Sequence, residues 1–363
     1  MSLPIIITAT TSSIPFLVSV NSKPAAVIVS ILFSLGFLNG HTARAEVVLN
    51  GGGATFPYAL YDKWFAAFAK LDSTVRFSYQ KVGSGEGQKL ITNQAIDFGA
   101  SDAPMSSEAL ANAPGKILHL PTVGGADVII FNLHNVKELQ LDGPTLAAIY
   151  LGKITQWKDP AITQQNPGVK IPDEQITVVH RSDGSGTSYI FTDYLCSISP
   201  EWKLKVGRYL SVNWPIGVGL TGSDAVAAYV KNTPGAIGFV ELLYAIQNQL
   251  TYASIKNQAG IYTRATTDSI TAALSAVTVP DDFRISVVNA PGPDAYPIAG
   301  VTWLLVYENS QDAIKAKKLA AFLTWAETEG QKMARDLNFA PLPENVQSRV
   351  LSAIHTIAPD GPQ

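Results

Sequence analysis

The sequence is 363 residues long, which exceeds an average domain and predicts two domains of ordinary size. Its composition, 47% hydrophobic and 15% charged with 28 glycines and 22 prolines, is typical of a globular protein with many turns. Because the formal net charge is only -3, the sequence lacks the basic excess of a nucleic-acid binder, and any bound anion must be held by local geometry. The only cysteine, Cys196, excludes an internal disulfide and is expected to be a buried structural thiol.

The N-terminal segment differs from the rest of the chain. It contains no acidic residue before Glu46, and its only formal charges are Lys23 and Arg44. An apolar run at residues 25–38 is followed by Ala43-Arg44-Ala45, a small-x-small cleavage site, so we predict a signal peptide over residues 1–45 and export to the periplasm. An upstream start or an uncleaved anchor would also account for the long stretch before Lys23. After this segment, no run approaches the ~20 apolar residues of a membrane span.

The first part of the mature chain alternates between strand and helix patterns. Apolar or alternating runs predict strands, and amphipathic spacing predicts helices. The expected strands are at residues 47–49, 75–79 and 96–100, and the expected helices are at 58–71, 88–93 and 106–113. Three polar loops follow the strands, at residues 51–57, 83–87 and 101–102.

The same alternation continues toward the C-terminus. Strands are expected at residues 128–131, 176–179, 236–240 and 301–306, and helices at 144–151, 223–231 and 313–326. A fourth polar loop, residues 181–187, lies between the strand at 176–179 and a following helix. Alternating strands and helices predict an α/β fold with a mainly parallel sheet.

These four loops indicate an anion site. In a parallel sheet, ligands bind beyond the carboxyl ends of strands, where helix N-termini present free N–H groups. Glycines allow close approach, hydroxyls donate hydrogen bonds, and Arg181 offers a two-pronged charged contact. The alternative is that each loop only caps its helix, through Thr55, Ser84 and Ser185. Four such loops in one chain, one of them with an arginine, favour the anion site.

Motifs of catalysis and cofactor binding do not occur in the sequence. It has neither G-x-x-x-x-G-K-[ST] nor a suitably placed G-x-G-x-x-G, and it has no G-x-S-x-G elbow. Its five histidines show no metal-ligand spacing, and His180, beside Arg181, is expected to be a solvated or strand-end histidine. We therefore expect no catalytic residue, no metal and no cofactor.

Two aspartates in these loops need separate explanations. Asp102 would repel a fully ionised anion, so it either caps a helix or accepts a hydrogen bond from a ligand that keeps a proton. Phosphate keeps one at neutral pH and sulfate does not, so Asp102 favours phosphate. Asp183 is expected to hold the guanidinium of Arg181.

Six segments of the sequence resemble the periplasmic phosphate-binding proteins of ABC transporters, the PstS family. The segments follow the family's order over nearly the whole mature chain, and DFGASD and the R-x-D-G-S-G-T string are the most specific. They are residues 53–57 (GATFP), 97–104 (DFGASDAP), 149–154 (IYLGKI), 181–188 (RSDGSGTS), 214–217 (WPIG) and 234–238 (PGAIG).

The resemblance implies an α/β, two-lobed periplasmic binding protein of type II, with hinged lobes and the ligand in the cleft between them. One lobe would comprise residues 46–125 and 296–363, and the other residues 126–295. Asp102 would accept the phosphate proton, and Asp183 would support Arg181. The implied phosphate ligands are Thr55, Phe56 (through its main-chain N–H), Ser84, Asp102, Arg181, Ser185, Gly186 and Thr187.

The resemblance also implies partners. A monomeric protein would bind inorganic phosphate and deliver it to the permease and ATPase subunits of an importer. Two alternatives remain open: a secreted phosphatase on the same scaffold, and a binding protein for another oxyanion such as sulfate or molybdate. The first lacks a visible base or metal cluster, and Asp102 argues against the second, because those anions cannot donate to it.

Overall fold

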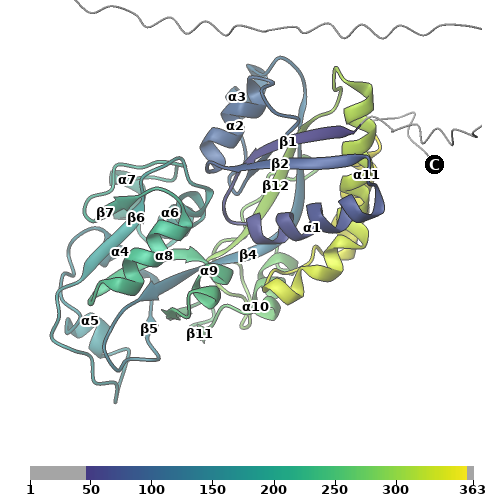
Figure 1. Ribbon diagram of the computed structural model, residues 1–363. Coiled ribbons are helices and arrows are strands. Elements are labelled where there is room, and N and C mark those ends of the chain that lie inside the picture. The colour runs from purple at the N-terminus through teal and green to yellow at the C-terminus, as the bar shows by residue number, and fades with distance from the viewer. Residues whose placement is uncertain (1–45, 358–363) are drawn as a thin grey trace, which may run out of the picture. The chain divides into compact units, whose positions relative to one another are not determined.

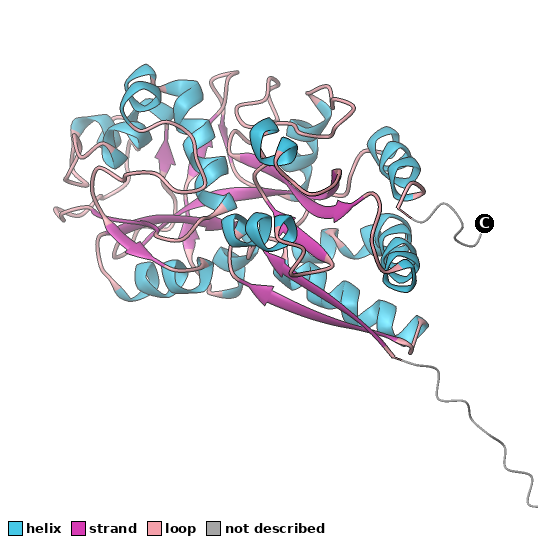
Figure 2. Ribbon diagram, turned by 90° about the horizontal axis from the view of Figure 1, so that it is seen from above, coloured by secondary structure: helices cyan, strands magenta, loops and turns pink. Residues whose placement is uncertain are grey.

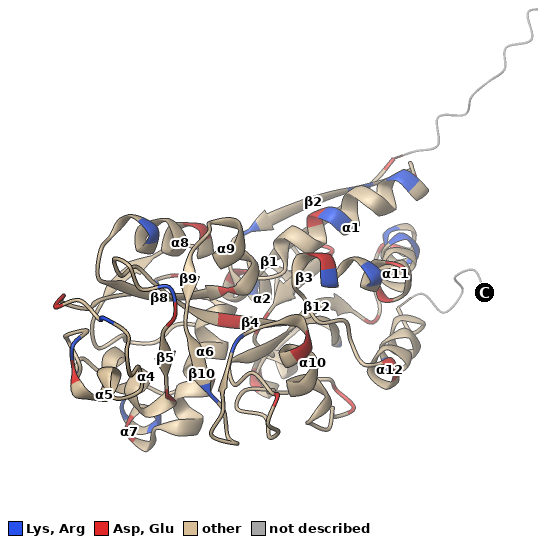
Figure 3. Ribbon diagram, turned by 90° about the horizontal axis from the view of Figure 1, so that it is seen from below, with Lys and Arg blue, Asp and Glu red and all other residues tan. Residues whose placement is uncertain are grey.

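A computed structural model describes residues 46–357 (Figure 1). These residues belong to one compact unit of the chain. The predicted signal peptide, residues 1–45, lies outside the described residues. Within residues 46–357, no helix combines the length and the apolar character that crossing a membrane requires. In the view of Figure 3, both basic and acidic residues occur on either side of the described chain.

A mixed sheet of nine strands runs through the described residues. The prediction of a mainly parallel sheet is correct for the two ends of the sheet and wrong for its centre. The pairs β2–β1, β1–β3, β8–β6 and β6–β7 are parallel, whereas β12 and β4 run antiparallel to their neighbours. In sheet order the strands are β2 (Val75–Lys81), β1 (Val47–Gly53), β3 (Phe98–Ser101), β12 (Ala299–Tyr307), β4 (Ile117–Phe131), β8 (Ala236–Glu241), β6 (Thr177–Arg181) and β7 (Val218–Leu220), and β9 (Thr251–Tyr252) also pairs with β4.

Strand β4 connects the two ends of the sheet. Its first part pairs with β12, and residues 127–131 pair with β8. The sequence predicted only residues 128–131 as a strand, because Pro121, Gly124 and Gly125 are poor strand formers. The structure accommodates the proline opposite Trp303, where the register between β12 and β4 shifts. Gly124 and Gly125 leave room for side chains of Leu274 and Phe56 that a Cβ atom would meet.

Helices flank the strands on both sides (Figure 2). The predicted helix 58–71 has the bounds of α1, but five later helices, α5, α7, α9, α10 and α12, were not predicted. The helices are α1 (Tyr58–Leu71), α2 (Ser84–Thr92), α3 (Ser107–Ala111), α4 (Gly143–Tyr150), α5 (Pro160–Thr163), α6 (Gly186–Ile198), α7 (Pro200–Lys205), α8 (Ser223–Asn232), α9 (Leu242–Gln247), α10 (Thr267–Ser275), α11 (Ala313–Thr328) and α12 (Glu344–Ile354), with 3-10 turns at Gly330–Met333 and Arg335–Leu337. A small second sheet contains β5 (Gln140–Leu141), β10 (Ser254–Lys256) and β11 (Tyr262–Thr263).

Aromatic side chains form a cluster at each end of the large sheet. At one end, Phe77 stacks on Phe65 of α1, with ring centroids 4.5 Å apart. At the other end, Phe239 of β8 stacks on Phe191 of α6 at 4.2 Å. Helix α10, which falls in the predicted second lobe, packs against β4 and β12. The division into residues 46–125 with 296–363 and residues 126–295 stays a prediction.

Candidate oxyanion-binding site

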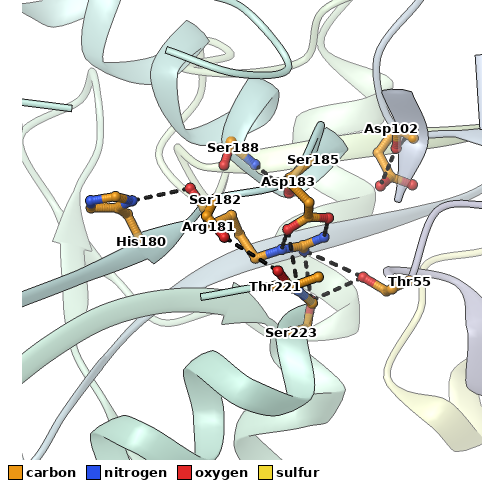
Figure 4. Close-up of polar contacts among 12 residues, drawn as sticks. Thr55, Asp102, His180, Arg181, Ser182, Asp183, Ser185, Ser188, Thr221 and Ser223 are labelled. Carbon is orange, nitrogen blue, oxygen red and sulfur yellow. Dashed lines mark hydrogen bonds and ion pairs between the residues drawn. The ribbon is translucent and has the colours of Figure 1, made fainter. Parts of the chain in front are cut away.

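Strand pairing brings the predicted loops together at the carboxyl ends of the strands. Gly53 at the end of β1 pairs with Ala100 of β3, so Thr55 and Asp102 follow neighbouring strands. In the same way, Arg181 at the end of β6 pairs with Leu220 at the end of β7. These four strand ends supply the polar side chains in Figure 4.

Arg181 lies at the centre of the site and is only 2% exposed. Its Nε donates to Asp183 Oδ1 at 2.6 Å, and its Nη2 donates to Oδ2 of the same carboxylate, a two-pronged pair. Its Nη1 faces two hydroxyls, Ser223 Oγ at 3.1 Å and Thr55 Oγ1 at 3.4 Å. Burial acts to raise the pKa of Asp183, but the hydrogen bonds and charge of Arg181 outweigh it and leave that pKa below its usual value. The pair therefore supplies a fixed, buried guanidinium.

Thr55 and Phe56 follow β1, and the Thr55 side chain has polar contacts whereas the Phe56 ring lies among apolar side chains. The Thr55 hydroxyl lies 3.1 Å from Ser223 Oγ, and its carbonyl accepts a hydrogen bond from the Tyr244 hydroxyl at 2.8 Å. Helix α1 has Pro57 at its N-cap without a side-chain cap, so the capping alternative is wrong for Thr55. The Phe56 ring is buried, 6.1 Å from that of Phe339. Only the main chain of Phe56 is therefore a candidate contact for a polar ligand.

Asp102 and Ser84 form a second polar pair. Ser84 Oγ accepts from the Asp102 N–H at 3.1 Å and donates to Asp102 Oδ2 at 3.2 Å. Asp102 Oδ1 is buried and has no hydrogen-bond partner among the described residues. Burial raises the pKa of Asp102 to about 7, and the hydrogen bond from Ser84 and the charge of Arg181 act in the opposite direction. Asp102 thus offers one open acceptor oxygen. The Ser84 side chain does not cap α2, so the capping alternative is wrong for this serine, whose hydroxyl contacts Asp102 instead.

The start of α6 lies directly against Asp102. A Cβ atom on Gly186 would be 2.4 Å from both Asp102 Oδ2 and Ser84 Oγ, so only glycine fits there. Ser185 Oγ accepts from the Ser188 N–H at 3.1 Å, which confirms the capping alternative for this serine. The Thr187 hydroxyl is buried without a hydrogen-bond partner among the described residues. A further hydrogen bond, from Gly85 N–H to the Gly184 carbonyl at 2.8 Å, joins two of the loops.

Sequence reasoning missed Ser223. It follows β7, a strand of three residues that showed no apolar run, and it is the first residue of α8. Gly222 precedes it with a φ of 80°, a left-handed conformation that suits glycine. The available signal was Gly222-Ser223 at the start of an amphipathic helix, the same pair of residues as Gly83-Ser84 and Gly184-Ser185.

The histidine and the cysteine considered from the sequence, His180 and Cys196, pack against other parts of the protein. His180 is 8% exposed, stacks on Trp214 with ring centroids 4.7 Å apart and has a pKa lowered by burial, so it is a strand-end histidine rather than a solvated one. Cys196 is half-buried on α6, less than predicted, and burial raises its thiol pKa. Among residues 46–357, no group of three or more His, Cys, Asp or Glu side chains is arranged to hold a metal ion.

Comparison with known proteins decides the family. The model of the PBP superfamily domain matches residues 40–328. The phosphate-binding protein PstS of Xylella fastidiosa is 41% identical over 309 residues, 84% of each chain, and that of Pasteurella multocida is 40% identical over 329 residues, 90% of this chain and 94% of its own. The chain belongs to the PstS family of phosphate-binding proteins. Its α/β fold with a mixed sheet is the type II periplasmic binding protein fold.

Solved structures support the same fold. A high affinity periplasmic phosphate-binding protein with bound phosphate matches with a TM-score of 0.69 and 24% identity, over 84% of this chain and 93% of that protein. A phosphate-binding protein from Stenotrophomonas maltophilia matches with a TM-score of 0.67 and 23% identity over the same shares.

Proposed function

We propose that this protein binds one inorganic phosphate in the periplasm and delivers it to the permease and ATPase subunits of an ABC importer. The ligands proposed are Thr55, Phe56 N–H, Ser84, Asp102, Arg181, Ser185, Gly186 and Thr187. One observation carries the proposal: a buried guanidinium and several hydroxyls face the same region as an aspartate with one open acceptor oxygen. The names of the PstS relatives support phosphate as the ligand.

The proposal includes a mechanism of capture. Residues 46–125 and 296–363 form one lobe, residues 126–295 form the other, and the lobes close on the anion. Arg181 and the hydroxyls neutralise and hold the phosphate oxygens, while Asp102 Oδ1 accepts the proton that phosphate retains. The protein acts as a monomeric receptor without catalysis. Steady phosphate release from a phosphomonoester, lost on substitution of a site residue, would contradict that last point.

Ligand selectivity is the first test. We expect the purified chain to bind phosphate one to one and sulfate at least about 100-fold more weakly, because sulfate would leave a buried charged acceptor unsatisfied. Titration calorimetry with both anions at pH 8 measures the ratio. Equal affinities for the two anions would contradict the assignment to phosphate and favour a general oxyanion receptor.

Asp102→Asn tests the source of that selectivity. An amide can donate to an unprotonated oxyanion, so this variant is expected to reduce the ratio of phosphate to sulfate affinity about tenfold or more. In the wild type, sulfate binding should strengthen as the pH falls toward 7, because Asp102, with its pKa raised to about 7, takes up a proton and becomes a donor. The variant should lack this pH dependence. An unchanged ratio, with sulfate binding that still depends on pH, would refute the role of Asp102.

A further inference from the structure

Ser223 links two of the proposed ligands from a strand end that the sequence did not single out. Its Oγ lies 3.1 Å from Arg181 Nη1 and 3.1 Å from Thr55 Oγ1 (Figure 4). The residue is only 1% exposed, so both contacts are shielded from bulk solvent. Hydrogen bonds in such surroundings are electrostatically stronger than in water.

The chemistry of the three groups fixes the direction of the hydrogen bonds from Arg181. A guanidinium has donors only, so Ser223 Oγ must accept from Arg181 Nη1. The Ser223 hydroxyl can donate to Thr55 Oγ1 or accept from it, because its oxygen has a second lone pair. Arg181 Nη1 also approaches Thr55 Oγ1, at 3.4 Å, which again makes the threonine oxygen an acceptor. When Ser223 donates to Thr55, the hydrogen of the Thr55 hydroxyl is left for another partner.

The backbone holds Ser223 in this position through the same carboxylate that holds Arg181. Asp183 Oδ1 accepts from Arg181 Nε at 2.6 Å and from the Gly222 N–H at 3.2 Å. The pairing of β6 with β7 places Arg181 opposite Leu220, three residues before Ser223. Arg181 and Ser223 are thus positioned by shared contacts, and their hydroxyl–guanidinium contact does not depend on a flexible side chain alone.

We propose that Ser223 is a positioning residue of the oxyanion site, which sets the hydroxyl of Thr55 as a hydrogen-bond donor to the bound anion. The order of donation runs from Arg181 through Ser223 to Thr55 and then to an anion oxygen. A threonine hydroxyl on its own can donate or accept, so this order adds a donor that suits an oxyanion lone pair. The inference rests on the proposed phosphate-binding function.

A double-mutant cycle with inorganic phosphate tests the inference. Ser223→Ala is expected to weaken phosphate binding about tenfold, the cost of one or two buried hydrogen bonds, whereas Ser223→Thr keeps a hydroxyl and should lose less. In a Thr55→Val background, Ser223→Ala should change the affinity by no more than about twofold, because the hydroxyl on which it acts is gone. Ser182→Ala is the matched control, since Ser182 Oγ lies 3.3 Å from Thr221 Oγ1 in an exposed contact.

Calorimetric affinities, with thermal unfolding of each variant without phosphate, separate the outcomes. Three outcomes would each overturn the role of Ser223. The first is wild-type affinity in Ser223→Ala, and the second is a loss of affinity in Ser223→Thr at least as large as in Ser223→Ala. The third is an equal loss of affinity from Ser223→Ala in both backgrounds of the cycle. These results leave phosphate binding by the wild type intact. Failure of the wild type to bind phosphate would instead overturn the proposed function itself.

Discussion

Arg181→Gln is expected to weaken phosphate binding by at least about 100-fold, since truncating one partner of a buried charged contact costs about 3–5 kcal/mol. Arg181 is the buried cation whose Nη1 faces the hydroxyls of Thr55 and Ser223. The substitution also leaves Asp183 without its counter-charge, and that carboxylate would then repel the anion. Loss of attraction and gain of repulsion act in the same direction.

Arg208→Gln is the matched control for this measurement. Arg208 also pairs with an aspartate, Asp193 at 2.7 Å, but its side chain is 47% exposed and none of its hydrogen bonds reaches the candidate site. We expect titration calorimetry to show wild-type affinity for Arg208→Gln and no measurable binding, or very weak binding, for Arg181→Gln. If Arg181→Gln lost less than about tenfold, the guanidinium would not be the main source of affinity.

Arg181→Lys separates charge from geometry. A lysine keeps the positive charge but cannot make the two-pronged contact with Asp183 and still reach two hydroxyls. Its affinity for phosphate should therefore lie between those of the wild type and Arg181→Gln. Affinity equal to that of the wild type would mean that charge alone suffices.

The sequence predicted the parts of the fold that depend on local patterns. Helix α1 was placed correctly because its apolar residues recur at helical spacing and Pro57 precedes it. The first part of β4 was missed because Pro121 and two glycines argue against a strand, and only pairing with β12 overrides that preference. The centre of the sheet was wrongly predicted as parallel for the same reason: the direction of β12 is set by tertiary contacts between segments far apart in the sequence.

Most of the side chains that lie together at the candidate site were named from the sequence, whereas their contacts could not be predicted. The motif around Arg181 indicated an oxyanion ligand set, and the spacing of Asp183 suggested its partner. The contacts of Ser223 with Thr55 and Arg181 depend on the position of α8, which follows a strand too short to give a pattern. The capping alternative, drawn from residue type alone, was correct for Ser185 and wrong for Thr55 and Ser84.

A buried acid pair was also beyond prediction, because it depends on the register of β4 and β8. Asp127 and Glu241 lie directly opposite each other on these antiparallel strands, and both are 0% exposed. Both oxygens of Asp127 and one of Glu241 have no hydrogen-bond partner among the described residues, while Glu241 Oε2 accepts from the Leu243 N–H at 2.8 Å. Two charged carboxylates cannot be held in this way, so at least one proton must be bound.

Asp127→Asn is therefore expected to stabilise the protein at alkaline pH. Burial raises the pKa of Asp127 well above its usual value, helped by the charges of Asp102 and Glu241 and opposed by Arg181, and burial raises that of Glu241 likewise. The folded protein thus keeps a proton that the unfolded chain releases above pH ~4. Stability is full below that pH and is lost as the pH rises toward the folded pKa, by up to about 1.4 kcal/mol per unit for each such group.

Urea unfolding between pH 5 and 9 measures this effect. The free energy of unfolding of the wild type should fall across the range, and that of Asp127→Asn should fall less steeply, so that their difference grows with pH in favour of the variant. Asp62→Asn, on the exposed face of α1, is the control and should leave the slope unchanged. Parallel curves for the wild type and Asp127→Asn would show that Asp127 is ionised in the folded protein. In that case a buried countercharge would have to lie against the oxygens of Asp127. A bound proton would then not explain how two buried carboxylates can lie opposite each other on β4 and β8.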